Sequence, residues 1–211
     1  MKGEVKMKVK LFLAASMLIA LAIDYVSAQE LKDRQLKPAF DFTTIESPVE
    51  IVSIKLKGKE VAPGDKIKGD DDWLKGICFK VKNASDKPIA YVAIGLRFEP
   101  PPGGARVVVF ILSYGVYYPG GEPRSGSSPL PIQPDQTVDL ELTDQRYPNF
   151  LDILRRGGMP MGFDVVPYYV ERVSFEDDPN IVWEGGYLKR KNPTRLGRFD
   201  IIGPYKLPTK R

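Results

Sequence analysis

Residues 76–98, GICFKVKNASDKPIAYVAIGLRF, constrain the fold more than any other part of the chain. Apolar and polar residues alternate in two runs, 77–82 and 90–99, and a period of two indicates a β-strand with one buried face. The turn between them, residues 83–88, holds side chains that bond their own backbone and a proline that lacks an N–H donor. We therefore predict a β-hairpin with one apolar face. A lone hairpin cannot bury that face, so a second sheet must cover it.

The rest of the chain supplies further strands. They are predicted from alternation or apolar runs at residues 49–57, 107–112, 137–143, 163–176 and 181–189. The run VVVFIL at 107–112 is apolar throughout, so we expect a central strand that is covered on both faces. The turn at 177–180 is expected to close a second hairpin, and Gly185-Gly186 predicts a bulge in its second strand or a close approach of another backbone segment. Apolar residues among the basic residues of 189–211 predict that part of this tail docks as a last strand.

The period changes between residues 147 and 158. Pro148 suits the first turn of a helix, Phe150 and Leu154 recur at helical spacing, and Gly157-Gly158 ends the pattern. One short crossover helix that plugs an end of the core is therefore expected. The pattern as a whole predicts an all-β fold, an antiparallel β-sandwich with one short crossover helix.

The N-terminus has the three parts of a secretory signal peptide. Lysines precede the apolar run LFLAASMLIALAI at 11–23, and Val26-Ser27-Ala28 provides small residues at a cleavage position. The run is shorter than the roughly 20 residues that span a bilayer, so cleavage is favoured over a retained anchor. We expect a signal peptide at 1–28, a flexible arm at 29–48, the sandwich at 49–205 and a basic tail at 206–211. The mature protein is then secreted or periplasmic and has no transmembrane segment.

Composition excludes several kinds of chemistry. The chain has no histidine, which removes Ser-His-Asp and Cys-His catalysis and imidazole metal sites. Cys78 is the only cysteine, so no internal disulfide or thiolate cluster can form, and we interpret it as a packed side chain. The net charge of +4, half of it in residues 1–28, gives no cationic footprint for nucleic acid. We expect no cofactor and no catalytic residue, although glycoside hydrolysis needs only two carboxylates.

Aromatic residues offer one set of candidate ligand-binding positions, namely Tyr114, Tyr117, Tyr118 and Trp183. Tyrosines that end a strand form a recognition surface or cap the core with the ring inward. A tryptophan beside carboxylates can be a platform for a sugar ring, and it can equally belong to the core. The sequence leaves both alternatives open.

Acidic residues offer a second set of candidates, for calcium: Asp70, Asp71, Asp72, Asp177 and Asp178. Calcium prefers hard oxygen ligands, but a calcium loop needs about six to eight of them in a set geometry. No EF-hand spacing is present. A solvated turn that protects a sheet edge is the alternative interpretation of residues 70–72.

Two segments carry a resemblance to known proteins. Residues 77–98 resemble the paired strands of secreted bacterial Ig-like β-sandwich modules, in which a V-x-N-x-S-x-K-x-I turn joins two core strands. Residues 173–178 with 181–186 are similar to the C-terminal hairpin of uncharacterised exported bacterial proteins. The resemblance implies an Ig-like sandwich and export, and it implies no substrate.

These observations lead to two main functional hypotheses, besides a module that is stabilised by calcium at the acidic residues named above. The first is an exported, non-catalytic β-sandwich that acts as a binding or structural module of the cell envelope or extracellular space, with a protein or polysaccharide partner. The alternative is a carbohydrate-binding or carbohydrate-active protein that uses exposed aromatics and acidic loops.

Overall fold

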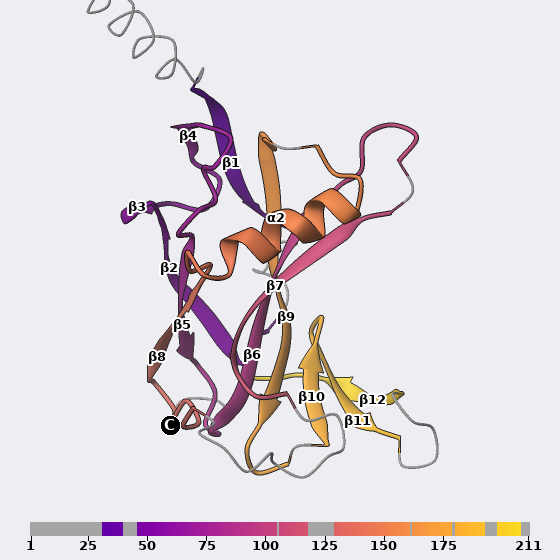
Figure 1. The fold of residues 1–211 in the computed structure, drawn as a ribbon. Coiled ribbons are helices and arrows are strands. Elements are labelled where there is room, and N and C mark those ends of the chain that lie inside the picture. Colours follow the sequence, from indigo (N-terminus) through magenta and orange to yellow (C-terminus); the bar gives the residue numbers. More distant parts are fainter. Residues whose placement is uncertain are drawn as a thin grey trace, which may run out of the picture. The chain divides into compact units, whose positions relative to one another are not determined.

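The computed structural model describes residues 31–39, 46–104, 106–117, 129–160, 162–178, 180–192 and 198–207. Most of them belong to strands, which form two sheets, as an all-β sandwich requires (Figure 1). The elements are β1 (Lys32–Pro38), β2 (Val49–Leu56), β3 (Lys59–Val61), β4 (Lys66–Gly69), β5 (Cys78–Asn83), β6 (Ile89–Phe98), β7 (Val108–Gly115), β8 (Thr137–Glu141), α2 (Tyr147–Arg156), β9 (Val165–Phe175), β10 (Ile181–Glu184), β11 (Tyr187–Lys191) and β12 (Phe199–Pro204).

The small sheet is antiparallel, in the order β3-β2-β5-β8. Its strands show the predicted alternation, because Phe79 and Leu140 are opposed and fully buried, whereas Lys80 and Asp139 are opposed on the outer face. The predicted strands at 49–57 and 137–143 are confirmed as β2 and β8. Period-two residues thus give this sheet one core face and one charged face.

The large sheet is built on β9. Along one side β9 pairs with β6, and beyond β6 lies β7. Along the other side, the first half of β9 pairs with β1 and the second half pairs with β10. Beyond β10 the sheet continues with β11 and then β12. The β1–β9 pair is parallel, with Gln35 opposite Val165, so the sandwich is not wholly antiparallel as predicted.

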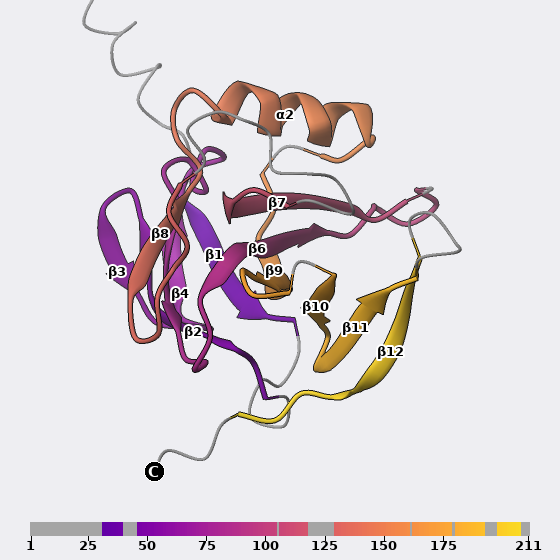
Figure 2. The ribbon, with the colours of Figure 1, turned by 90° about the horizontal axis from the view of Figure 1, so that it is seen from below.

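The predicted hairpin of residues 76–98 is wrong in its pairing. β5 pairs with β2 and β8 in the small sheet, whereas β6 pairs with β7 and β9 in the large sheet (Figures 1 and 2). The turn at 83–88 therefore carries the chain from one sheet to the other as an arch. Both strands are alternating as predicted, but their apolar faces meet across the core instead of lying side by side.

Buried polar groups hold this arch. The Asn83 side chain is fully buried and donates from Nδ2 to the carbonyl oxygens of Lys87 and Ile132, both at 2.8 Å. Its Oδ1 accepts from the Ser85 N–H at 2.9 Å and from the Ser85 hydroxyl at 2.7 Å. The predicted bonding of this turn to its own backbone is confirmed, and the bond to Ile132 ties it to a segment 49 residues away.

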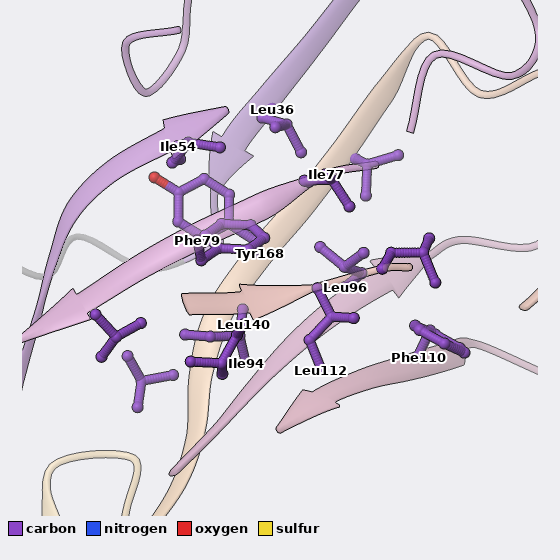
Figure 3. Close-up of a cluster of buried hydrophobic side chains, with 14 of the residues drawn as sticks. Leu36, Ile54, Ile77, Phe79, Ile94, Leu96, Phe110, Leu112, Leu140 and Tyr168 are labelled. Carbon is purple, nitrogen blue, oxygen red and sulfur yellow. The ribbon is translucent and has the colours of Figure 1, made fainter. Parts of the chain in front are cut away.

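The core lies between the two sheets (Figure 3). Phe79 of the small sheet faces Tyr168 of the large sheet with ring centroids 5.2 Å apart, and Ile94, Leu96 and Leu112 are fully buried around them. Each such side chain stabilises the fold by about 1.5–3 kcal/mol relative to an exposed position.

Helix α2 forms where it was predicted and covers the core beside β7 (Figure 2). Its buried residues are Tyr147, Phe150 and Leu154, and the Phe150 ring lies 4.9 Å from Phe110 of β7. Pro148 lies in its first turn, and Arg155 and Arg156 lie in its last, where the helix dipole favours cations.

The predicted central position of residues 107–112 is wrong. Within the described part of the chain β7 pairs only with β6, so it is an edge strand. Its apolar character comes from Phe110 and Leu112, which face the core, while Val109 is 37% exposed on the outer side. Arg146 at the start of α2 donates to the Ile111 carbonyl at 3.0 Å and so occupies the free edge.

Residues 32–38, which were expected to belong to a flexible arm at 29–48, form β1. Its buried side chains are Arg34 and Leu36. Arg34 donates to the carbonyls of Gly69 and Gly162 and forms ion pairs with Asp71 at 2.7 Å and Asp164 at 2.8 Å. The buried guanidinium is thus fully engaged, which stabilises a strand whose sequence is mostly polar.

The C-terminal part follows the prediction except at one turn. β9 and β10 pair as the predicted second hairpin, and the predicted docking of the tail is confirmed by β12, which pairs with β11. Gly185-Gly186 is not a bulge. The two glycines have φ of 60° and 90°, the geometry of a two-residue hairpin turn, and they join β10 to β11.

Candidate functional site

The predicted ligand-binding aromatics do not converge. Trp183 is 1% exposed, lies opposite Val173 on the core side of the large sheet, and donates from its indole to the Glu46 carbonyl at 3.1 Å. It cannot be the surface platform for a sugar that was one alternative. Tyr114 packs against the core and donates from its hydroxyl to the Leu130 carbonyl at 2.9 Å, so it caps the core. Tyr118 lies outside the described residues.

The acidic residues at 70–72 point to three different partners. Asp70 forms an ion pair with Lys57 at 2.7 Å, Asp71 pairs with Arg34, and Asp72 accepts the Tyr147 hydroxyl at 2.8 Å. Burial, together with the bond to Asp72, raises the pKa of Tyr147. These carboxylates therefore fix a turn and do not share one ligand position.

Asp177 and Asp178 are also occupied separately. Asp177 forms an ion pair with Lys87 at 2.6 Å, and Asp178 lies 4.0 Å from Arg190. Throughout the described ranges no group of three or more histidine, cysteine, aspartate or glutamate side chains is placed to hold a metal ion. The geometry gives no support to calcium at either acidic cluster.

Tyr117 is the one predicted aromatic that lies on the outer face of the large sheet. Its ring lies 5.2 Å from the ring of Tyr91 on β6 and 4.8 Å from the Arg172 guanidinium on β9. Arg172 in turn forms an ion pair with Glu184 of β10 at 3.2 Å. A cation over a tyrosine ring is attracted by the π-electrons, so the four side chains hold one another in place.

Backbone features make this stacking possible. At Gly115, where β7 ends, a Cβ atom would lie 1.9 Å from the Ala90 carbonyl oxygen, so only glycine permits the close approach from which the chain continues to Tyr117. At Gly95 of β6 a Cβ would lie 2.9 Å from the ring of Tyr169, which occupies the space above that glycine. Tyr169 and Gly95 are opposed in the β6–β9 pair and thus lie on the same face. We call the set Tyr91, Tyr117, Tyr169, Arg172 and Glu184 the tyrosine–arginine face.

The tyrosine hydroxyls of this face stay protonated. Burial raises the pKa of Tyr91, Tyr117 and Tyr169 above the usual value for tyrosine, and for Tyr169 the bond to the Glu171 carboxylate raises it further. The phenol groups are therefore neutral near neutral pH, and the Tyr117 hydroxyl and the Arg172 Nε are themselves buried. A ligand can stack on the exposed parts of the rings and can bond the outer atoms of Arg172 and Glu184, whose side chains are 26% and 31% exposed.

A hollow of about 370 Å³ lies at the β10–β11 turn and shares no residue with this face. Its residues come from the β10–β11 turn, from the end of β12 and the residues that follow it, and from the segment just before β2. They are Glu46, Gly185, Gly186, Tyr187, Pro204, Tyr205 and Lys206. Tyr187 is opposed to Glu184, so the two side chains point to the same side of the sheet. Burial raises the pKa of Tyr205 to about 12. The hollow brings two tyrosines together with one carboxylate and one ammonium group.

The only cysteine shows no sign of activation. Cys78 is half-buried on the outer face of the small sheet, opposite Lys55 and Glu141. Burial and the carboxylates of Asp139 and Glu141 raise its pKa, so the thiol stays protonated and is a poor nucleophile. This agrees with its interpretation as a packed side chain.

No protein-family model, curated protein or solved structure matches this chain. Across the described residues no helix has both the length and the apolar character needed to cross a membrane.

Sequence reasoning missed most of the tyrosine–arginine face. Tyr117 is its only member among the predicted ligand-binding residues, which do not include Tyr91, Tyr169, Arg172 and Glu184. Their alternation along β9 and β10 is a usable signal for the outer face. Which of them meet across strands depends on the β6–β9 and β9–β10 registers, and these are not contained in local periodicity.

Proposed function

We propose that this protein is an exported, non-catalytic binding module whose ligand contacts the tyrosine–arginine face. The observation that carries the proposal is the stack of Tyr91, Tyr117 and Arg172, because it lies outside the core and is held rigid before any ligand binds. Tyrosine and arginine are enriched where proteins bind partners, since they present a large contact area with a polar group and lose little freedom on binding.

Export and the Ig-like type belong to the same proposal. Export is supported by the signal-like pattern of residues 1–28 in the sequence. An Ig-like relationship is supported by the arch at 83–88, since strands that cross between two packed sheets are typical of such sandwiches. The proposed site of action is the cell envelope or the extracellular space. Intact mass measurement of the secreted chain is expected to give an N-terminus at Gln29, and an uncleaved chain would contradict this part.

The binding claim is tested with variants of matched size. Tyr117→Ala and Arg172→Ala remove the two sides of the stack, while Lys80→Ala alters the outer face of the small sheet and serves as the control. Immobilised proteins are exposed to solubilised envelope material and to extracellular polysaccharide of the source cells. We expect a component that binds the wild type and the control, and binds each face variant at least tenfold more weakly. Equal retention by all four proteins would show that the face is not the binding surface.

A polysaccharide is the second candidate ligand, and one observation favours it. The hollow combines the half-exposed ring of Tyr187 with Glu46 and Lys206, and sugars bind through ring stacking and hydrogen bonds to charged groups. In the same retention experiment, Tyr187→Ala is expected to weaken binding of a polysaccharide and leave a protein partner bound. Unchanged retention of the polysaccharide would exclude the hollow.

A further inference from the structure

Residues 83–85, Asn83-Ala84-Ser85, form an acceptor sequence for N-linked glycosylation. It is the only Asn-X-Ser or Asn-X-Thr sequence in the chain in which X is not proline. In an exported protein such a sequence is expected in a surface loop, because the glycan is bulky and needs solvent around it. Here the Asn83 side chain is fully buried, and Ser85 is 5% exposed. The folded protein therefore has no room for a glycan at this asparagine.

The atom that would carry the glycan already uses both of its hydrogens. Nδ2 of Asn83 donates one of them to the Lys87 carbonyl and the other to the Ile132 carbonyl, both at 2.8 Å. N-glycosylation joins this nitrogen to the anomeric carbon of an oligosaccharide pyrophosphate donor. The bond from that carbon to the pyrophosphate oxygen breaks, and one N–H proton is released to solvent. One of the two hydrogen bonds that hold the arch closed is thereby lost, and the sugar occupies the space of its acceptor.

The segment that covers Asn83 comes later in the chain. The Asn83 N–H donates to the Gln136 carbonyl at 2.9 Å, and the Asn83 carbonyl accepts from the Asp135 N–H at 2.9 Å. Ile132 lies 49 residues after Asn83, and synthesis of that length takes about 2–10 s. During this time the arch cannot close. Asn83 is then open to a glycosylating enzyme in any compartment that contains one.

We infer that glycosylation of Asn83 and folding exclude each other, so that the chain reaches its folded form only where export leaves Asn83 unmodified. A glycan that is added early keeps residues 132–136 from docking on Asn83. Once these residues have docked, an enzyme no longer reaches Nδ2. The inference extends the export part of the proposed function and is independent of what the tyrosine–arginine face binds.

A second acceptor sequence at an exposed turn provides the matched comparison. Asp135→Asn creates one at residues 135–137, beside the arch. Asp135 has a φ of 63°, a conformation that asparagine adopts more readily than most residues, so the turn is expected to persist. The Asp135 side chain is 75% exposed, and a glycan at this position therefore projects into solvent.

The assay translates the full chain, behind the secretory signal of a host protein, into microsomes of the endoplasmic reticulum. The added signal makes the result independent of whether residues 1–28 direct export. Glycan occupancy at positions 83 and 135 is measured by mass spectrometry in all chains. It is measured again, after solubilisation, in the chains that resist protease, because resistance selects chains that have folded.

Among the Asp135→Asn chains that resist protease, we expect glycan occupancy at Asn83 to be at least tenfold lower than at position 135. In the wild type, occupancy at Asn83 is expected to be at least tenfold lower in the resistant chains than in all chains. Ser85→Ala combined with Asp135→Asn removes the acceptor sequence at 83 and is expected to leave occupancy at 135 unchanged. Equal occupancy at the two positions in resistant chains would overturn the inference, as would wild-type resistant chains that carry as much glycan at Asn83 as all chains do.

Discussion

Asn83→Ala tests whether residues 83–88 form a buried arch between the sheets or a solvated hairpin turn. The substitution removes four hydrogen bonds, two donated to the carbonyls of Lys87 and Ile132 and two accepted from Ser85. Asn83 is fully buried and Ser85 is 5% exposed, so water does not replace these bonds easily. Three of the four partner groups keep another hydrogen bond, so each lost bond is counted at its net value of about 1 kcal/mol.

Four lost bonds at that value give a destabilisation of about 4 kcal/mol. For a chain of this size that corresponds to a fall in melting temperature of about 8–16 °C. Ser85→Ala removes only the hydroxyl bonds and is expected to cost about 1 kcal/mol. Asp86→Ala is the matched control, because Asp86 is exposed in the same turn and its loss is expected to cost less than about 0.5 kcal/mol.

Urea denaturation followed by tryptophan fluorescence measures these differences, since Trp73 and Trp183 are both buried and their emission changes on unfolding. If Asn83→Ala costs no more than Asp86→Ala, the turn is solvated and the assignment of β5 and β6 to different sheets is wrong.

Three further changes follow from the buried residues. Trp183→Ala is expected to destabilise the fold by about 3–5 kcal/mol in the same denaturation assay, because the Trp183 side chain is buried in the core. A loss of stability below about 1 kcal/mol would show that the side chain lies on the surface. Arg34→Ala is expected to lower the free energy of unfolding by about 3–5 kcal/mol, because it leaves Asp71 and several carbonyls without their donor. Asp164 is an exposed partner of Arg34, so Asp164→Ala is expected to lower it by less than about 1 kcal/mol. Equal losses of stability in the two variants would contradict this role of Arg34. Burial raises the pKa of Tyr168 to about 12, so its neutral form stabilises the fold fully below pH 10, and this contribution, about 2–3 kcal/mol, is lost as the pH rises to 12. Tyr168→Phe is expected to flatten the loss of stability over that pH range, and an unchanged slope would refute the assignment.

Periodicity was sufficient to predict most strands and the helix. In β2, β5, β6 and β8, and around Phe150, the burial of each residue follows from its place in the local repeat. The sequence pattern alone therefore predicts these elements. Strand pairing was not predicted in the same way. A six-residue polar turn fits a hairpin or an arch equally well, and the choice is made by Asn83, whose partner Ile132 is distant in sequence.

The failures at β1 and β7 have a similar cause. β1 looks polar because its main buried residue is Arg34, and its carbonyl and carboxylate partners are supplied by residues 69–71 and 162–164. β7 looks like a central strand because α2 covers its apolar residues, as the contact between Phe110 and Phe150 shows. In both cases a tertiary contact gives the residue its environment.

The candidate site was predicted least well. The core alternative for Trp183 is confirmed, and of the predicted aromatics only Tyr117 lies on the tyrosine–arginine face. Tyr117 follows β7, Arg172 lies on β9 and Glu184 on β10, so their meeting requires three strands in a fixed register. Residue type and spacing within one segment cannot supply that information.

The arch at 83–88 and the core between two sheets both require that β5 and β6 belong to different sheets. Proton–proton NOEs between strands of isotope-labelled protein measure this directly. We expect cross-strand contacts between Phe79 and Leu140 and between Ile94 and Leu112, with no ladder of contacts between residues 78–83 and 89–98. A regular antiparallel ladder joining those two segments would contradict the account.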